Sequence, residues 1–465
     1  MAETTKIHGI LDLENLECLV EKGEIDTIIT VFPDMYGRLV GKRVMGDYFL
    51  EKISANEYFF ACDYLLACDL EMEPIPGYEI TSWDAGYGDF QLIPDLTTLR
   101  LCTWLDKTAV VLCDLKEDQS EIPVQVSPRQ ILKNQINRLD ELGLTMKIGS
   151  ELEFFIFKDS YEEIDQKGFV GLTPFSRYME DYNILQGTKE EDIVGTIRRN
   201  IHNSGIPVEF SKGETGLGQQ EINLQYTGAL EMADRHVLYK HAAKEIAWQK
   251  GHAVSFMAKW NEDHAGSGLH IHVSLWDKNS DKAVFPGSDD LEGLKVSPVF
   301  RWFLGGWMKN MKEIFSFYAP YPVSFKRYVE GSFAPTKIAW AKENRTAGFR
   351  IVGHSDSLRI ECRLGGADAN PYLAFASAIA AGMDGIINRI EPDPMVRGNA
   401  YESEDSLSVP ITSEESIQQM ECSNWIREAF GNEVIDHYLH FFRTEQRAFQ
   451  KVVTDWERAR YLERI

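Results

Sequence analysis

Charged and metal-binding side chains recur at a spacing of two residues within short apolar segments. Glu151 and Glu153 lie in the run GSELEFFIF, and His270 and His272, followed by Ser274, lie in GSGLHIHVSL. In a β-strand, residues i and i+2 project from the same face, so this spacing directs both side chains into one cavity. The sequence therefore predicts strands with polar faces where a core would be apolar.

Two further segments show a related pattern. Arg359, Glu361 and Arg363 alternate in LRIECRL, and Glu214 and Glu221 lie in GETGLGQQEINL. Burying such groups is costly unless they are paired or bound to metal. A solvated strand face or a structural ion-pair network explains any one segment about as well as a functional site does. The apolar flanks of all four segments together favour a functional site.

The ligand types in these segments select the metal. Five carboxylates and one imidazole form a mainly hard, oxygen-rich set that fits Mg²⁺ or Mn²⁺, whereas zinc favours more nitrogen or sulfur. Because Mg²⁺ normally keeps several waters, six protein ligands favour two ions with three ligands each. Paired ions beside several arginines are typical of phosphoryl transfer. The chain has no GxxxxGK[ST] motif, so ATP must be held by a fold other than a P-loop.

The elements that position these residues divide the chain in two. Early strand-like runs indicate a small strand-rich domain, followed by a polar linker at 116–125 and by Ser127 and Pro128 as the N-cap and first residue of a helix. Beyond the linker, helices and strands alternate without regular βαβ spacing, which predicts an α+β fold. We place the domains at 1–120 and 121–465. The strand-like runs are 25–32, 38–44, 90–93 and 109–115.

Length and charge exclude several other classes of protein. A chain of 465 residues favours two domains, and its net charge of −24 argues against a nucleic-acid partner. Seven scattered cysteines without a CxxC pair are typical of reduced thiols. The sequence has neither a signal-like N-terminus nor a run of eighteen apolar residues, so we expect a cytoplasmic protein without a membrane partner.

The ordered motifs resemble those of glutamine synthetases. Besides the four segments, they include Lys326-Arg327, Asn344-Arg345-Thr346 and Ala369-Asn370-Pro371-Tyr372, and the similarity runs in order over about residues 20–465. The resemblance implies a β-grasp domain with a leading helix in 1–120 and a catalytic domain with a funnel of strands in 121–465. It implies a homo-oligomer, a double ring of ten or twelve subunits with sites between subunits.

The same resemblance implies a reaction and a role for each matching residue. ATP phosphorylates the γ-carboxylate of glutamate, and an amine then displaces phosphate from the γ-glutamyl phosphate. One ion would be held by Glu153, the catalytic Glu214 and Glu221, and the other by Glu151, His270 and Glu361. Glu209, His272, Ser274, Arg350 and Arg359 would surround the nucleotide. Gly266, Arg327 and Arg363 would bind glutamate, and Arg345 would lie over the transferring phosphate. Asp63, in FFACDYLL, matches loosely an aspartate that a neighbouring subunit contributes to the amine pocket; a surface aspartate is the alternative.

The chain departs from ammonia-using members at Phe333, which stands six residues after Arg327 where those enzymes carry a glutamate. An aromatic ring covers the hydrocarbon tail of an organic amine better than it binds ammonium, which needs acceptors on several sides. The SFAPT and NRTAGFR phrases are similar to γ-glutamylpolyamine and other γ-glutamylamide synthetases. We therefore expect an organic amine or polyamine as acceptor, with Phe333 in its pocket.

Other interpretations stay open at this point. Glu330 lies three residues from Phe333 and offers a substitute carboxylate, which keeps a glutamate–ammonia ligase as the alternative. A catalytically idle relative predicts damaged ligands, whereas all six are present. Phosphotransfer to a guanidino acceptor, as in creatine kinase, leaves the N-terminal domain unexplained. Lys212 precedes Glu214 by two residues, in a stretch where many ammonia-using members have histidine, and Tyr401 is predicted to be an exposed loop residue.

Overall fold

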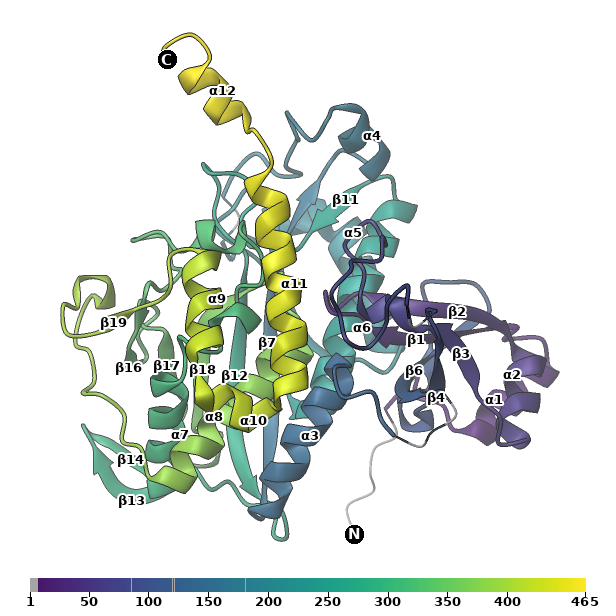
Figure 1. The fold of residues 1–465 in the computed structure, drawn as a ribbon, viewed down its shortest axis with the longest axis horizontal. Coiled ribbons are helices and arrows are strands. Elements are labelled where there is room, and N and C mark those ends of the chain that lie inside the picture. The colour runs from purple at the N-terminus through teal and green to yellow at the C-terminus, as the bar shows by residue number, and fades with distance from the viewer. Residues whose placement is uncertain (1–6, 85, 119, 121, 180) are drawn as a thin grey trace.

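The computed structural model describes residues 7–465 except positions 85, 119, 121 and 180 (Figure 1). Its N-terminal part consists of α1 (Leu13–Glu21), β1 (Thr27–Pro33), β2 (Leu39–Met45), α2 (Gly46–Ser54), β3 (Phe59–Cys62), β4 (Asp89–Pro94), β5 (Arg100–Leu101) and β6 (Thr108–Glu117). The six strands of the described chain here form one sheet in the order β2-β1-β6-β4-β3, with β5 beside β6. β1 and β6 pair in parallel and are almost entirely buried, as their β-branched, apolar sequences predict.

The second sheet carries the polar segments. Its strands are β7 (Leu144–Phe157), β8 (Val208–Gly213), β9 (Gln219–Leu224), β10 (Thr227–Gly228), β11 (Ala253–Ser255), β12 (Gly268–Asp277), β16 (Trp340–Lys342), β17 (Phe349–Val352) and β18 (Arg359–Gly366). In the described residues they follow the order β16-β17-β18-β12-β7-β9-β8, with β10 and β11 also beside β7. The predicted polar segments therefore lie on neighbouring strands.

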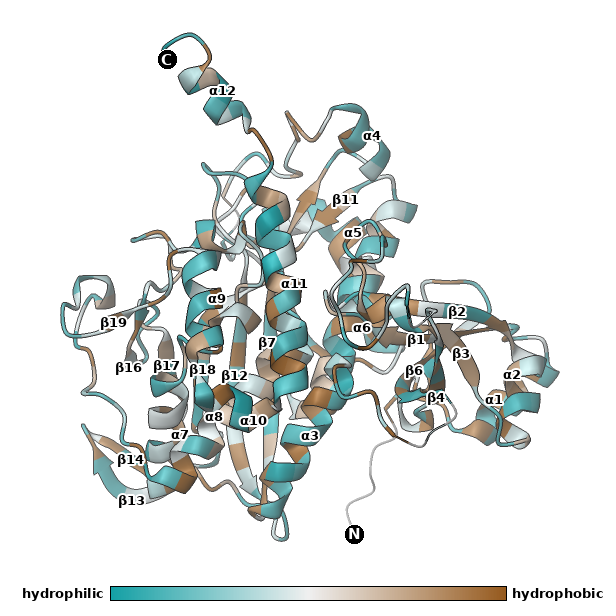
Figure 2. Cartoon of the chain, in the orientation of Figure 1, coloured by the Kyte–Doolittle hydropathy of each residue, from teal (hydrophilic) through white to brown (hydrophobic). Residues whose placement is uncertain are grey.

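Helices cover the outside of this sheet (Figure 1). α8 is buried along most of its length, whereas α11 buries one face and alternates hydrophobic and hydrophilic residues in Figure 2. The helices are α3 (Pro128–Glu141), α4 (Tyr161–Gln166), α5 (Ile184–Asn203), α6 (Ala229–Gln249), α7 (Pro298–Lys309), α8 (Pro371–Asn388), α9 (Ser413–Cys422), α10 (Asn424–Phe430), α11 (Asn432–Gln450) and α12 (Asp455–Tyr461). A short hairpin pairs β13 (Pro286–Leu291) with β14 (Leu294–Val296), and a separate two-stranded sheet pairs β15 (Lys337–Ile338) with β19 (Leu407–Ser408), which lies far along the chain.

The expected α+β class is confirmed, and local details refine it. α3 begins at Pro128 with Ser127 as N-cap, as predicted, although the Ser127 side chain makes no capping hydrogen bond. β6 continues to Glu117, two residues into the predicted linker, of which positions 119 and 121 lie outside the described residues. None of the described helices has the length and hydropathy needed to cross a lipid bilayer.

Buried polar residues connect the N-terminal part of the chain with the helices beside the second sheet. Arg129 of α3 pairs with Asp95 (2.7 Å) and Asp114 (2.5 Å) beside the small sheet and with Asp234 of α6 (3.0 Å). Asn370 caps α8 by accepting from the Tyr372 amide (3.1 Å). Its Nδ2 also donates to the carbonyls of residues 34 and 35, at 3.3 and 3.1 Å. The start of α8 is thereby fixed against the loop between β1 and β2.

Replacing Asn370 by alanine is expected to lower the free energy of unfolding by about 2 kcal/mol, because one cap and two buried hydrogen bonds to the loop between β1 and β2 are lost. Urea unfolding measures the change. Asn388→Ala is the matched control, since Asn388 lies exposed at the other end of α8 and bonds only Asp384 among the described residues; it should change the value by less than about 0.5 kcal/mol. Equal losses in both variants would contradict the proposed connection.

Candidate active site

Strand register brings the predicted metal ligands together. β12 pairs with β7 so that His270 lies opposite Glu151, and β7 pairs with β9 so that Glu153 lies opposite Glu221. β12 also pairs with β18, which places His272 opposite Glu361. Side chains directly opposite each other in antiparallel strands are close neighbours. The spacing of two along each strand thus becomes a cluster across four strands.

The first cluster consists of Glu153, Glu214 and Glu221, whose nearest carboxylate oxygens lie within 4.8 Å of one another. Burial and the charge of Glu214 raise the pKa of Glu153 to about 7. Burial, together with the charges of Glu151 and Glu214, raises the pKa of Glu221 well above its usual range. Lys212 partly offsets this repulsion. Crowded, buried oxygen donors fit a hard divalent cation, which would remove the remaining repulsion.

The second cluster is built around Glu151. Its oxygens lie 3.3 Å from His270 Nδ1 and 2.9 Å from His272 Nε2, and these contacts outweigh burial and lower the pKa of Glu151. Burial and the charge of Arg363 lower the pKa of His270 to about 4, so its imidazole is neutral and able to bind metal. Glu151 and Glu361 lie within 4.8 Å of His272, and His270 lies within 4.8 Å of Glu151 and Glu221 and 3.8 Å from Glu361. Either imidazole is therefore within reach of the expected second ion.

Arginines surround the second cluster. Arg363 donates to Glu361 at 2.5 Å and Arg350 donates to its other oxygen at 2.9 Å. Although burial opposes ionisation, the charge of Arg363 is the largest opposing influence, and the pKa of Glu361 falls to about 2. Arg327 is buried and donates to the backbone carbonyls of residues 363 and 364. The cluster thus combines anionic ligands with fixed positive charge, which suits a phosphorylated substrate.

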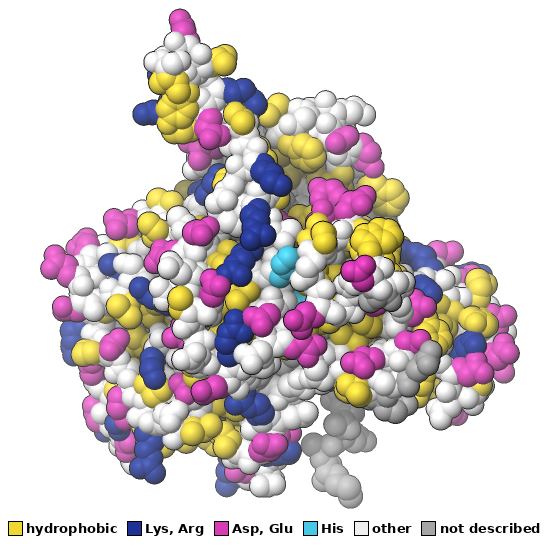
Figure 3. Space-filling model, in the orientation of Figure 1, with side chains coloured by type: hydrophobic (Ala, Val, Ile, Leu, Met, Phe, Trp, Pro, Cys, Tyr) yellow, Lys and Arg dark blue, Asp and Glu magenta, His cyan; other side chains and the backbone are white. Residues whose placement is uncertain are grey.

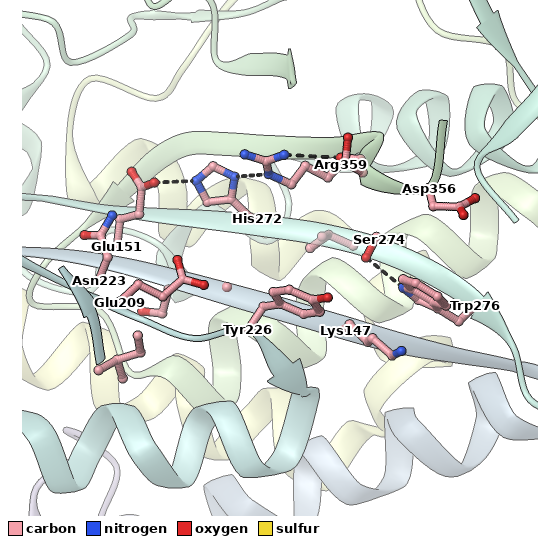
Figure 4. Close-up of a pocket in the computed structure, with 15 residues that line it drawn as sticks. Lys147, Glu151, Glu209, Asn223, Tyr226, His272, Ser274, Trp276, Asp356 and Arg359 are labelled. Atoms are coloured by element: carbon pink, nitrogen blue, oxygen red, sulfur yellow. Dashed lines mark hydrogen bonds and ion pairs between the residues drawn. The ribbon is translucent and has the colours of Figure 1, made fainter. Parts of the chain in front are cut away.

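Two cavities meet at Glu151. The first, of about 490 Å³, is the one drawn in Figure 4. There Glu151, His272 and Arg359 form a row, with Arg359 Nε donating to His272 Nδ1 at 3.2 Å. Trp276 Nε1 donates to Ser274 Oγ at 2.9 Å. Of the residues predicted to surround the nucleotide, this cavity is lined by Glu209, His272, Ser274 and Arg359.

The second cavity, of about 480 Å³, contains the first carboxylate cluster. Arg350, predicted beside the nucleotide, lines this cavity and not the first, because its guanidinium is held by Glu361 and by Glu343 (2.9 Å). The residues predicted to contact glutamate, phosphate or amine also line it: Gly266, Arg327, Phe333, Arg345 and Arg363.

Asp63 lies apart from both cavities of its own chain. It is 8% exposed and accepts hydrogen bonds from Thr81 Oγ1 (2.5 Å) and the Gly88 amide (2.9 Å). The alternative of a surface aspartate is therefore wrong, since the carboxylate is buried within the N-terminal part. Its predicted role in a neighbour's amine pocket stays a prediction.

Residues 125–461 match the model of the glutamine synthetase catalytic domain. The chain belongs to the glutamine synthetase family. It is 44% identical to a gamma-glutamylethanolamide synthetase of Streptomyces coelicolor, covering 98% of this chain and 96% of that one. It is 35% identical to a glutamate–isopropylamine ligase of a Pseudomonas species, covering 96% and 97%. The solved structure named apo GmaS without ligand superposes with a TM-score of 0.84 at 24% identity, over 97% of this chain and all of that one, which shows a shared fold.

Family membership makes the chain an ATP-dependent carbon–nitrogen ligase, and the interpretation of the motifs as those of a glutamine synthetase is confirmed. The family uses ATP, glutamate and a divalent metal ion. In this chain, both acidic clusters offer donor sets that fit such ions.

Several lining residues of this glutamine synthetase site were not assigned from sequence. Tyr182 and Phe210 line the second cavity, and Tyr226 and Trp276 line the first. Only Trp276 shows a signal, since it continues the spacing of two after His270, His272 and Ser274. Lys212, which lies in the stretch where many ammonia-using members have histidine, also lines the second cavity.

The burial of Tyr401 differs from the sequence prediction. It is half-buried, whereas the sequence predicted an exposed residue, and its hydroxyl donates to the carbonyl of Ala334 at 3.2 Å. Because Ala334 follows Phe333, this bond holds the segment that carries the phenylalanine.

Proposed function

We propose that this enzyme forms a γ-glutamyl amide from glutamate and an organic amine, through a γ-glutamyl phosphate made from ATP. Phe333 carries this proposal: it is 57% exposed and lines the cavity that also contains the glutamate-binding candidates. An apolar ring at this place favours a carbon-bearing amine over ammonium. The two relatives named above are both named for organic amines, at 44% and 35% identity.

The proposed binding of glutamate uses buried positive charge. Arg327 and Arg363 are 4% and 5% exposed and both line the cavity, where they would pair with carboxylates. Gly266 leaves room beside them, since a Cβ at this position would meet Arg327 Cγ at 2.7 Å and the Ala258 carbonyl at 2.8 Å. Only glycine permits this approach of backbone to Arg327.

The reaction requires the γ-carboxylate oxygen to become a leaving group. Two divalent ions, Mg²⁺ or Mn²⁺ in our proposal, would neutralise the transferring phosphoryl group when bound. Arg345 lines the same cavity with its side chain exposed, so it is placed to cover the transferring phosphate. His272 and Arg359, linked in the first cavity, would orient the nucleotide from the opposite side.

An apolar wall supports an organic acceptor. Tyr182, Phe210 and Phe333 line the second cavity and are 62%, 48% and 57% exposed. Exposed aromatic side chains beside a polar site are suited to covering a ligand's hydrocarbon part. Glu330, the possible replacement for the missing carboxylate, is exposed and is not among the described residues that line this cavity. The alternative of a glutamate–ammonia ligase therefore has less support.

Phosphate release with glutamate and ATP tests the acceptor directly. We expect ethanolamine or methylamine to exceed ammonium in kcat/KM, with putrescine included in the same panel. Phe333→Glu restores a carboxylate and is expected to improve the ammonium-to-ethanolamine ratio about tenfold or more, as for a charged hydrogen bond. Phe169→Glu, at a 69% exposed site outside both cavities, is the control. A wild-type preference for ammonium at low millimolar concentration would overturn the proposal.

Assembly into a homo-oligomeric ring in the cytoplasm completes the proposal. α12 projects from the body in Figure 1, and hydrophobic side chains are visible on it in Figure 3. Trp456 and Leu462 are 62% and 84% exposed, which is typical of a segment that packs against another subunit. Light scattering should give a mass many times that of one chain.

A further inference from the structure

Lys212 places a positive charge in the wall of the proposed amine cavity. It is the next-to-last residue of β8, and its side chain is only 14% exposed. Nζ donates to Glu214 and lies 3.9 Å from Glu221. It also lies 4.8 Å from the centre of the Tyr182 ring. All four residues line the second cavity.

These contacts are the ones that a cationic ligand would use. Ammonium and alkylammonium groups bind through carboxylates and through the faces of aromatic rings. In this cavity the Lys212 ammonium already lies over the Tyr182 ring and beside the carboxylate cluster. A substrate cation would have to displace it or lie beside it.

We propose that Lys212 is a charge-selectivity residue, which makes this enzyme favour amines with a neutral tail over diamines and polyamines. The inference rests on the proposed function, because it concerns the acceptor of that same reaction. It narrows the acceptor class to monoamines whose tail is apolar or hydroxylated. Phe333, Tyr182 and Phe210 then cover the tail, while Lys212 opposes a second positive charge.

The size of the cavity sets the strength of this effect. A space of about 480 Å³ is roughly 8 Å across, about one Debye length at physiological ionic strength, so a second ammonium anywhere inside it is poorly screened from Lys212. At the effective dielectric of a protein surface, two like charges this close reduce affinity by about tenfold or more. Glu214 and Glu221, which contact Lys212, and the exposed Asp181, which lines the same cavity, are the carboxylates that counteract its charge.

The test compares butylamine with 1,4-diaminobutane, which has the same carbon chain and one more ammonium group. The readout is the ratio of their kcat/KM values at saturating Mg²⁺, glutamate and ATP. Wild-type enzyme is expected to favour butylamine by about tenfold or more, and Lys212→Met to reduce that ratio about tenfold. Lys212→Arg keeps the charge and should keep the ratio. Lys212→Gln provides a second neutral variant should the methionine variant fold poorly.

A merely structural Lys212 gives a different result. If it only holds Glu214 in place, the neutral variants lose kcat/KM equally for both amines and the ratio stays at the wild-type value, which overturns the inference. Lys295→Met, at an exposed lysine of β14 paired with Asp290 at 3.2 Å, is the control and should leave the ratio unchanged. Failure of the proposed function is distinguishable, because wild-type enzyme would then use ammonium and neither organic amine.

Discussion

Replacing Glu361 by glutamine is expected to lower kcat for ligation about a thousandfold. The side chain is 1% exposed, and its two oxygens contact Arg363 and Arg350 at 2.5 and 2.9 Å, with His270 at 3.8 Å. Glutamine preserves the shape but removes the charge, so the proposed second ion loses a ligand. Electrostatic stabilisation and metal binding each contribute several kcal/mol to such reactions, which corresponds to this loss.

The same change is expected to destabilise the fold by about 3 kcal/mol, since two arginines lose a buried counter-charge. Steady-state phosphate release measures the first effect and urea unfolding the second. Glu343→Gln is the matched control: Glu343 contacts Arg350 at the same 2.9 Å but is 53% exposed, so its loss should cost less than about 1 kcal/mol. A folded Glu361 variant with kcat within tenfold of wild type would refute its role.

The spacing of two predicted the strands of this site correctly because it depends only on backbone geometry. Glu151 and Glu153, His270 and His272, and Glu361 all lie on strands of one sheet. Sequence alone did not fix which strands are neighbours. The order β18-β12-β7-β9 and its register decide that His272 lies opposite Glu361, so that this histidine also joins the second cluster.

Residues whose orientation depends on particular side-chain contacts were harder to predict. Arg350 turns toward the second cavity because Glu343 and Glu361 hold its guanidinium. Tyr401 is covered because its hydroxyl reaches Ala334, 67 residues away in sequence. No local pattern encodes the Tyr401 contact, so the sequence predicted an exposed loop residue there, whereas the predicted role of Arg350 beside the nucleotide stays a prediction.

The amine end of the cavity was the least predictable part. Tyr182 lies outside every strand, with a left-handed φ of 65°, and Phe210 lies at a register shift between β8 and β9. Neither position has a periodicity that marks it as part of a site. Family motifs identify the shared chemistry, whereas the residues that we propose for the acceptor lie in loops and at irregular strand positions, which no periodic pattern marks.

Replacing Arg345 by alanine is expected to lower kcat about a thousandfold without changing stability. Arg345 is exposed and lines the second cavity, and among the described residues its side chain has no ion pair or hydrogen bond. Its charge therefore contributes little to the folded state and is available to a phosphoryl group. An arginine that covers a transferring phosphate contributes about 10³-fold to 10⁵-fold in rate.

One further variant separates charge from geometry at this position, and a variant elsewhere serves as the control. Arg345→Lys keeps the charge but loses the planar fork of donors, so we expect an intermediate loss of about a hundredfold. Arg397→Ala is the control, since this arginine is 78% exposed and lies 3.5 Å from Glu292, away from both cavities. Steady-state kcat with ethanolamine measures all three, and thermal unfolding verifies that the midpoints agree. If Arg345→Ala retained more than a tenth of wild-type kcat, the transferring phosphate would have to be stabilised chiefly by other groups, and Arg350, which lines the same cavity, would be the first to examine.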